Sequence, residues 1–140
     1  MAIEIRIHPL DFEPDVAIGI GLPMMAANGT GFYMLYTTID QAVANSRNLL
    51  LTNKGERIMQ PTFGCDLRTI VFDNITEDLV AKIEDVIKTE FGYWLPYIFI
   101  NELVVVPSED TNQIAITLKI SLEGNKFDTR SIQLEVSINQ

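Results

Sequence analysis

The clearest pattern along the chain is a strict alternation of apolar and polar residues toward its C-terminal end. Residues 114–122 place apolar side chains at every second position, namely Ile114, Ile116, Leu118, Ile120 and Leu122. Residues 132–138 repeat the pattern with Ile132, Leu134, Val136 and Ile138. A period of two is typical of a strand with one buried face. Residues 98–106 are rich in Ile, Val and Phe, and turn-rich stretches at 107–112 and 123–128 separate the three segments, which predicts an antiparallel meander.

The first helical pattern begins at Thr38. Thr38 and Gln41 have the spacing of a capping box. The expected buried face consists of Ile39, Ala42, Val43, Ser46 and Leu50. Gly55, in the stretch Asn53–Gly55, is expected to end this helix because glycine adopts the left-handed conformation freely.

A second long helix is predicted after Thr76, which is a good N-cap residue. Its apolar stripe consists of Leu79, Val80, Ile83, Val86, Ile87 and Phe91. Gly92 is expected to end it. A short helix is also expected after Asp66, carrying Leu67, Ile70 and Val71.

These elements predict an α+β fold in which the two main helices pack on one face of the C-terminal antiparallel meander. The alternation at residues 3–7 predicts a short strand or extended arm. Residues 9–36 contain three prolines and four glycines, which favours an irregular segment. We therefore divide the chain into an N-terminal arm, residues 1–36, and a folded domain, residues 37–140. Residues 11–15 are a candidate partner-binding arm.

The segment 51–67 between the helices has little periodicity but many residues with a positional role. Arg57 offers a planar fork of donors for loop carbonyls or a carboxylate. Pro61 stiffens the backbone, and Gly64 permits a turn. Phe63 is expected to enter the core, and Asp66 to cap the short helix. From these features alone, a firmly held inter-helix loop is the simplest interpretation.

Charge and cysteine content limit the function classes. The chain carries 10 basic and 19 acidic residues, a net charge of -9, which disfavours nucleic acid and anionic membranes as partners. A single cysteine, Cys65, excludes an internal disulfide and fits a reducing compartment. The N-terminus lacks the pattern of a signal peptide. Glycine, proline and asparagine interrupt the apolar stretch 17–36, so we expect no membrane anchor and synthesis in the cytosol.

Enzymatic chemistry finds little support in the sequence. The only histidine, His8, lies beside Pro9 in an apparently extended arm, so no general base is expected near Cys65. One histidine and one cysteine do not make a metal cluster, and no cofactor is expected. Neither Gly19-Ile-Gly21 nor Gly29-Thr-Gly31 has the spacing of a phosphate-binding loop.

The order Gly-Glu-Arg at 55–57, Pro-x-Phe-Gly-Cys-Asp-Leu at 61–67, a Thr-capped helix and a meander resembles the baseplate wedge proteins of contractile-tailed phages. These are also called sheath initiators, and the type VI secretion baseplate has a counterpart. The resemblance covers about residues 38–138. It implies a structural subunit of the virion tail baseplate, assembled in the host cytoplasm. Its implied partners are wedge proteins and the tail sheath protein, with tail tube or hub proteins as further candidates.

The resemblance also implies that strand edges of the sheet template the first sheath ring. In this chain the predicted edge is Ile132, Leu134, Val136 and Ile138, because no element follows the last strand to cover it. Two alternatives stay open from the residues themselves. The last strand could be central in the sheet, or the arm at residues 3–7 could cover it.

The predicted wedge-docking site departs from the family pattern. Many members carry Glu-Pro-Arg after the second helix, where this chain reads Leu95-Pro96-Tyr97. The proline is kept and both charges are absent. An apolar or aromatic contact, with Trp94 as a further contributor, is the expected replacement.

Two competing functions remain beside the structural subunit. One is a free-standing protein-binding module with the same fold. The other is a peptidoglycan-cleaving glycosidase, because some family members have been described as lysozymes. Such an enzyme needs a pair of carboxyl groups that flank the glycosidic bond to be cleaved. The candidates here are Glu56, Asp66, Asp73, Glu77 and Glu102. Asp66 is expected to act as a helix cap and Glu56 lies beside Arg57, so we disfavour this alternative.

Overall fold

The computed structural model describes residues 9–22, 24, 31–72, 77–108 and 113–137. In chain order, its elements are η1 (Pro9–Phe12), β1 (Gly19–Ile20), β2 (Met34–Leu35), α1 (Thr38–Leu51), α2 (Leu67–Val71), α3 (Glu77–Trp94), β3 (Ile98–Ser108), β4 (Gln113–Leu122) and β5 (Asn125–Ser137). Residues 3–7, Thr76 and Ile138 lie outside the described residues, so the expectations for them stay predictions.

The main sheet has three antiparallel strands in the order β3-β4-β5, as the alternation predicted. The central strand, β4, buries every second side chain, and Ile114, Leu118 and Ile120 are fully buried. Among the described strands β4 is the central one, so the alternative in which the last strand lies in the middle of the sheet is wrong for these strands. β3 and β5 are the two border strands among the described residues.

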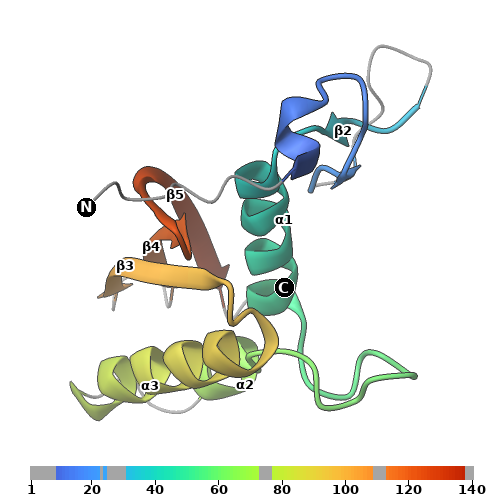
Figure 1. The fold of residues 1–140 in the computed structure, drawn as a ribbon. Coiled ribbons are helices and arrows are strands. Elements are labelled where there is room, and N and C mark those ends of the chain that lie inside the picture. Colours follow the sequence, from blue (N-terminus) through green and yellow to red (C-terminus); the bar gives the residue numbers. More distant parts are fainter. Residues whose placement is uncertain (1–8, 23, 25–30, 73–76, 109–112, 138–140) are drawn as a thin grey trace.

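The helices cover one face of this sheet, which confirms the predicted α+β class (Figure 1). The predicted stripe of α3 lies in the core, with Ile83, Ile87 and Phe91 at most 2% exposed. From α1, Ala42, Leu49 and Leu50 join the same cluster, and α2 adds Leu67, Ile70 and Val71. Figure 1 shows that α1 and α3 run at a steep angle to each other beside the sheet. Burial of these apolar faces joins helices and sheet into one core.

The described part of residues 9–36 is more regular than predicted. η1 is one 3-10 turn, and β1 pairs with β2 antiparallel through Gly19↔Leu35 and Ile20↔Met34. Arg47 of α1 also donates to the carbonyl of Leu22 at 3.3 Å. This segment lies at the start of α1, away from α2 and α3 (Figure 1).

The predicted ends of α1 and α3 need correction. The N-cap of α1 is Thr37, whose hydroxyl accepts from the Asp40 N–H, so the predicted box of Thr38 and Gln41 was one residue late. α1 ends at Leu51 with Thr52 as C-cap, and Gly55 lies in the following loop. α3 passes through Gly92 to Trp94, because Gly92 does not adopt the positive φ of a helix-ending glycine, and Pro96 follows.

The connection between β4 and β5 is shorter than the predicted turn at 123–128. Only Glu123 and Gly124 form the turn, with Gly124 at φ +98°, and β5 begins at Asn125. Leu122 pairs with Asn125 and Ser121 with Thr129, so the residues up to Asp128 form an irregularity within β5. The polar composition of this stretch predicted a longer turn, whereas the pairing of β4 with β5 continues beyond the irregularity.

Candidate interaction surfaces

The free border of β5 is the first candidate surface. From Ser121↔Thr129 to Gln113↔Ser137, β5 pairs with β4 in one unbroken register. Within the described residues, no strand lies on its other side. Unpaired backbone groups along such a border are a template for another strand.

The described side chains that were predicted for this edge face the core of the fold. Ile132 is fully buried and Val136 is 7% exposed, so both belong to the core, and Leu134 is half-buried. The residues between them, Ser131, Gln133 and Glu135, are exposed on the other face. A strand added here would therefore meet the backbone of β5 first.

The other border strand, β3, is interrupted. Its register with β4 shifts between Ile100 and Glu102, which leaves Asn101 as a bulge, and Pro107 lacks an N–H. Both features are ones that proteins use to protect strand borders. Of the two described borders, β5 has the longer uninterrupted ladder, over residues 129–137.

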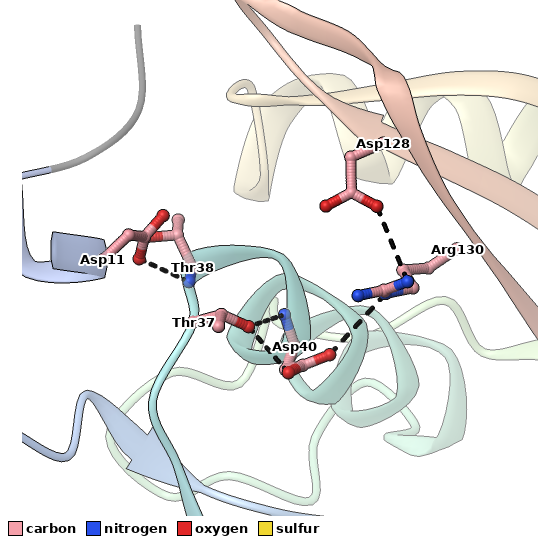
Figure 2. Close-up of polar contacts among 6 residues, drawn as sticks. All are labelled: Asp11, Thr37, Thr38, Asp40, Asp128 and Arg130. Atoms are coloured by element: carbon pink, nitrogen blue, oxygen red, sulfur yellow. Dashed lines mark hydrogen bonds and ion pairs between the residues drawn. The ribbon is translucent and has the colours of Figure 1, made fainter. Parts of the chain in front are cut away.

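A polar cluster fixes the first half of β5 and the N-terminal segment to the start of α1 (Figure 2). Arg130 of β5 pairs with Asp40 at 3.7 Å and with Asp128 at 3.5 Å. The same Asp40 accepts from the Thr37 hydroxyl at 2.6 Å. Asp11 accepts from both the N–H and the hydroxyl of Thr38, each at 2.8 Å. Negative charge at a helix N-terminus is favourable, so these carboxylates stabilise α1. Sequence patterns give no sign of the Asp11 contact, which joins residues 27 positions apart.

The loop between α1 and α2 is tightly hydrogen-bonded. The Gly55 N–H donates to the Pro61 carbonyl at 2.7 Å, which closes the loop on itself. Glu56 accepts from the N–H of Asn53 and from its side-chain amide. Arg57 stacks its guanidinium 3.9 Å above the Phe63 ring, a cation–π contact rather than the predicted bonds to carbonyls.

The base of this loop enters the core as predicted. Phe63 is 8% exposed and meets Trp94 of α3 edge-to-face at 5.1 Å. The Cys65 N–H donates to the Thr52 carbonyl at 3.2 Å. Cys65 is fully buried, and burial raises the pKa of its thiol to about 12, so this residue is a core side chain and no nucleophile.

Asp66 does not cap α2 with its side chain. It occupies the N-cap position with φ +55°, but its carboxylate accepts from the Lys54 N–H at 3.3 Å and the Thr69 hydroxyl at 3.4 Å. The Asp66 carboxylate thus joins the Thr69 side chain of α2 to the Lys54 backbone, and it accepts no backbone N–H of α2. Asp66 therefore ties the two ends of the loop together.

The predicted docking turn, residues 95–97, joins α3 to β3. Leu95 is 7% exposed and belongs to the core, while Pro96 is exposed. Tyr97 is 37% exposed, and its hydroxyl accepts from the Asn45 amide at 2.8 Å. Pro96 and the ring of Tyr97 are the parts of this turn that a partner could reach.

Three of the glycosidase candidates make structural contacts, whereas Asp73 and the side chain of Glu77 lie outside the described part of the chain. Glu56 and Asp66 bind loop donors as given above, and Glu102 pairs with Lys119 across β3 and β4. Within the described ranges no cluster of metal-ligating side chains occurs. No helix among the described residues is long and apolar enough to span a bilayer.

Comparison with known proteins decides the family. The family model described as baseplate wedge protein gp25 matches residues 38–126, more than half of the chain. The chain belongs to this family. This wedge protein is 28% identical over 89 residues to baseplate wedge protein gp25 of Enterobacteria phage T4, a match that covers 64% of the chain and 67% of the T4 protein. It is thus a structural component of a baseplate in a contractile tail or tail-like complex.

Solved structures support the same fold. A protein of Geobacter sulfurreducens named as a candidate tail lysozyme shares 24% identity at a TM-score of 0.63, over 76% of this wedge protein and 97% of the other chain. A chain of the anti-feeding prophage baseplate has a TM-score of 0.57 at 20% identity, over 86% and 85%. A chain of the type VI secretion baseplate complex has a TM-score of 0.54 at 18% identity, over 73% and 94%.

Proposed function

We propose that this wedge protein works only by binding other proteins. In this role it joins neighbouring wedge proteins and offers the free border of β5 to the first ring of tail-sheath subunits. The single observation that supports the sheath role is the regular stretch of β5 over residues 129–137, whose outer side carries no strand among the described residues. Addition of a strand supplies main-chain hydrogen bonds with little demand on side-chain identity.

The contrast between the two borders supports β5 over β3. The bulge at Asn101 and the missing N–H of Pro107 would interrupt a ladder along β3. Along β5, the ion pair between Arg130 and Asp40 links the strand to α1, so the border needs little reordering when a partner arrives. A pre-ordered border suits a template.

For the wedge partners we propose the turn at residues 95–97. Its contacts would be the exposed Pro96 and the Tyr97 ring, since Leu95 is buried in the core. An apolar and aromatic contact of this kind would replace the ionic one that the family pattern implies. The acidic net charge also favours basic surfaces on the partners.

A pair of proline variants tests the sheath role. Deletion of residues 131–140 would remove Ile132 and Val136 from the core, so single substitutions are better. The N–H groups of adjacent strand residues point to opposite sides, so one of Gln133→Pro and Leu134→Pro loses a bond to β4 and the other loses only a free donor. The variant that retains the wild-type unfolding temperature should lose binding to the sheath protein of the same tail.

The matching alanine variants, Gln133→Ala and Leu134→Ala, separate the loss of the side chain from the loss of the N–H. Binding is measured with purified sheath protein, and sheath growth on assembled baseplates is counted by electron microscopy. A folded proline variant that recruits sheath as well as its alanine control would refute the β5 template.

A further inference from the structure

The most exposed apolar side chains of the described residues lie in the loop between α1 and α2. Ile58 is 95% exposed, and the adjacent Met59 is 91% exposed. We refer to this pair as the apolar tip. Figure 1 shows that the loop projects away from the sheet and the helices. Single exposed apolar side chains are common on protein surfaces, whereas neighbouring ones that form a patch mark binding sites.

Hydrogen bonds hold the apolar tip in a defined turn. The Gln60 N–H donates to the Arg57 carbonyl at 3.2 Å, which closes a four-residue turn with the tip at its two central positions. Around this turn, the Gly55 N–H donates to the Pro61 carbonyl at 2.7 Å. Central turn positions favour glycine, proline, asparagine, aspartate and serine, so the turn gives no reason for isoleucine and methionine. A partner that covers the tip would find the loop already ordered.

The base of the loop is fixed to the C-terminal end of α3. Phe63 meets Trp94 edge-to-face at 5.1 Å, and Lys54 pairs with Glu90 of α3 at 2.5 Å. Trp94 comes shortly before the exposed part of the proposed docking turn, residues 95–97. The same end of α3 therefore supports both the loop and the docking turn. This continuity favours a wedge protein as the partner of the apolar tip.

Charge at the apolar tip differs from that of the whole chain. The protein has a net charge of -9, whereas Arg57 is the only charged residue among residues 57–62. Its guanidinium lies over the Phe63 ring and forms no ion pair with a described residue. A cation–π contact uses the face of the guanidinium and leaves its N–H donors available. The complementary site is an apolar pocket with a carboxylate at its mouth.

We propose that the apolar tip inserts into an apolar pocket with an acidic mouth on a different protein of the wedge. This inference rests on the proposed joining of wedge proteins and adds to it a contact separate from residues 95–97. Methionine adapts to irregular pockets, and a few buried apolar side chains supply most of the affinity of an interface. A second copy of this chain is the poorer occupant, because two copies of equal net charge repel each other.

Substitutions at the apolar tip leave the core undisturbed, because both side chains are exposed. Ile58→Ser and Met59→Ser remove apolar surface, whereas Ile58→Leu and Met59→Leu preserve it. Gln60→Ala is the matched control, because Gln60 is exposed on the same turn and only its backbone is hydrogen-bonded among the described residues. The probe is the wedge complex of the same tail, assembled without this protein and titrated with each full-length variant. Unfolding temperature checks that each variant is folded.

We expect each serine variant to weaken binding about tenfold or more, because burial of a large apolar side chain is lost. The leucine variants and Gln60→Ala should bind like the wild type. High salt should weaken the binding of the wild type more than that of Arg57→Gln, because the variant lacks the charge beside the tip.

Oxidation of Met59 reports the contact in the assembled baseplate. Peroxide converts an accessible methionine to its sulfoxide, which mass spectrometry locates in the chain. Met59 should react readily in the isolated protein, because it is 91% exposed. It should lose most of this reactivity when the protein is bound to the wedge complex.

The outcomes separate the tip from the proposed function. If the serine variants bind like the wild type, or if Met59 reacts equally fast in both states, the tip proposal is wrong while the joining of wedge proteins stands. If the wild type forms a dimer that Ile58→Ser does not form, the tip binds a second copy and the proposed occupant is wrong. If the wild type does not bind the wedge complex at all, the proposed function itself is wrong.

Discussion

Gly64 illustrates how single residues hold the loop between α1 and α2. Its φ is +128°, a region that side chains disfavour, and a Cβ there would lie 2.3 Å from the Thr52 carbonyl oxygen. The next residue, Cys65, donates its N–H to that same oxygen. The loop base can therefore approach the end of α1 only because residue 64 has no side chain.

Substitution of this glycine should be costly. We expect Gly64→Ala to lower the free energy of unfolding by about 3 kcal/mol, from backbone strain and the contact with Thr52. Gly55→Ala is the matched control, because Gly55 also has a positive φ, +92°, but nothing lies within 4 Å of its Cβ position. That variant should lose about 1 kcal/mol. Urea unfolding measures both, and equal losses would show that the contact with Thr52 is unimportant.

At the scale of elements, helix α1 is the centre of the fold. Its buried face packs on the core, and its first turn binds Asp11 of η1 and Arg130 of β5 (Figure 2). Thr37 and Asp40 cap the same end from within the chain's own turn. α1 thus connects the N-terminal segment to the border strand.

The Asp11 contact predicts a measurable coupling. Asp11→Ala should lower the free energy of unfolding by about 1 kcal/mol, because it removes an acceptor from the Thr38 N–H at the helix start. It should also speed hydrogen exchange of the amides in residues 9–22, since η1 loses its link to α1. Asp11→Asn, which keeps an oxygen acceptor, should recover part of the stability. Asp15→Ala, at an exposed position, is the control. Unchanged exchange in Asp11→Ala would contradict the link.

At the scale of the whole molecule, two groups make the free energy of unfolding depend on pH in the alkaline range. Burial raises the pKa of Cys65 to about 12 from its ordinary 9.0. The hydrogen bond to Glu90, at 2.5 Å, raises the pKa of Lys54 above its ordinary 10.5. In both cases the folded state holds its proton more tightly than the unfolded state does. Their stabilising contribution is therefore complete below the unfolded pKa and is lost as the pH rises through the folded pKa.

We expect the free energy of unfolding to fall between pH 9 and 12. Cys65→Ala should flatten the part of this fall that begins near pH 9, because it removes the buried thiol. Urea unfolding at several pH values measures both curves. A Cys65→Ala curve with the same slope as the wild type would show that the thiol has no part in the pH dependence. At pH 8, a thiol reagent should modify the wild type only as fast as the chain unfolds.

Much of the candidate site could be predicted from the sequence, and the errors concern helix caps, turns and side-chain orientation. The inner face of β5 and the roles of Phe63 and Gly64 follow from local pattern and residue type. The cap of α1, the turn before β5 and the orientation of Asp66 did not follow from the sequence. Each depends on which of several nearby residues makes the contact. Leu95 was predicted as a docking residue from its place in a motif, yet it lies in the core.

The sequence by itself determined which faces of strands and helices are buried, because a period of two or of 3.6 residues is a local property of the chain. It also determined the family, since unlike residues at fixed spacing identify the loop. Only the tertiary structure decided that β4 is central among the described strands and that Asp11 holds α1 across 27 positions. The physical reason is that these features arise from contacts between segments far apart in the chain, and such contacts leave no periodic trace in either segment.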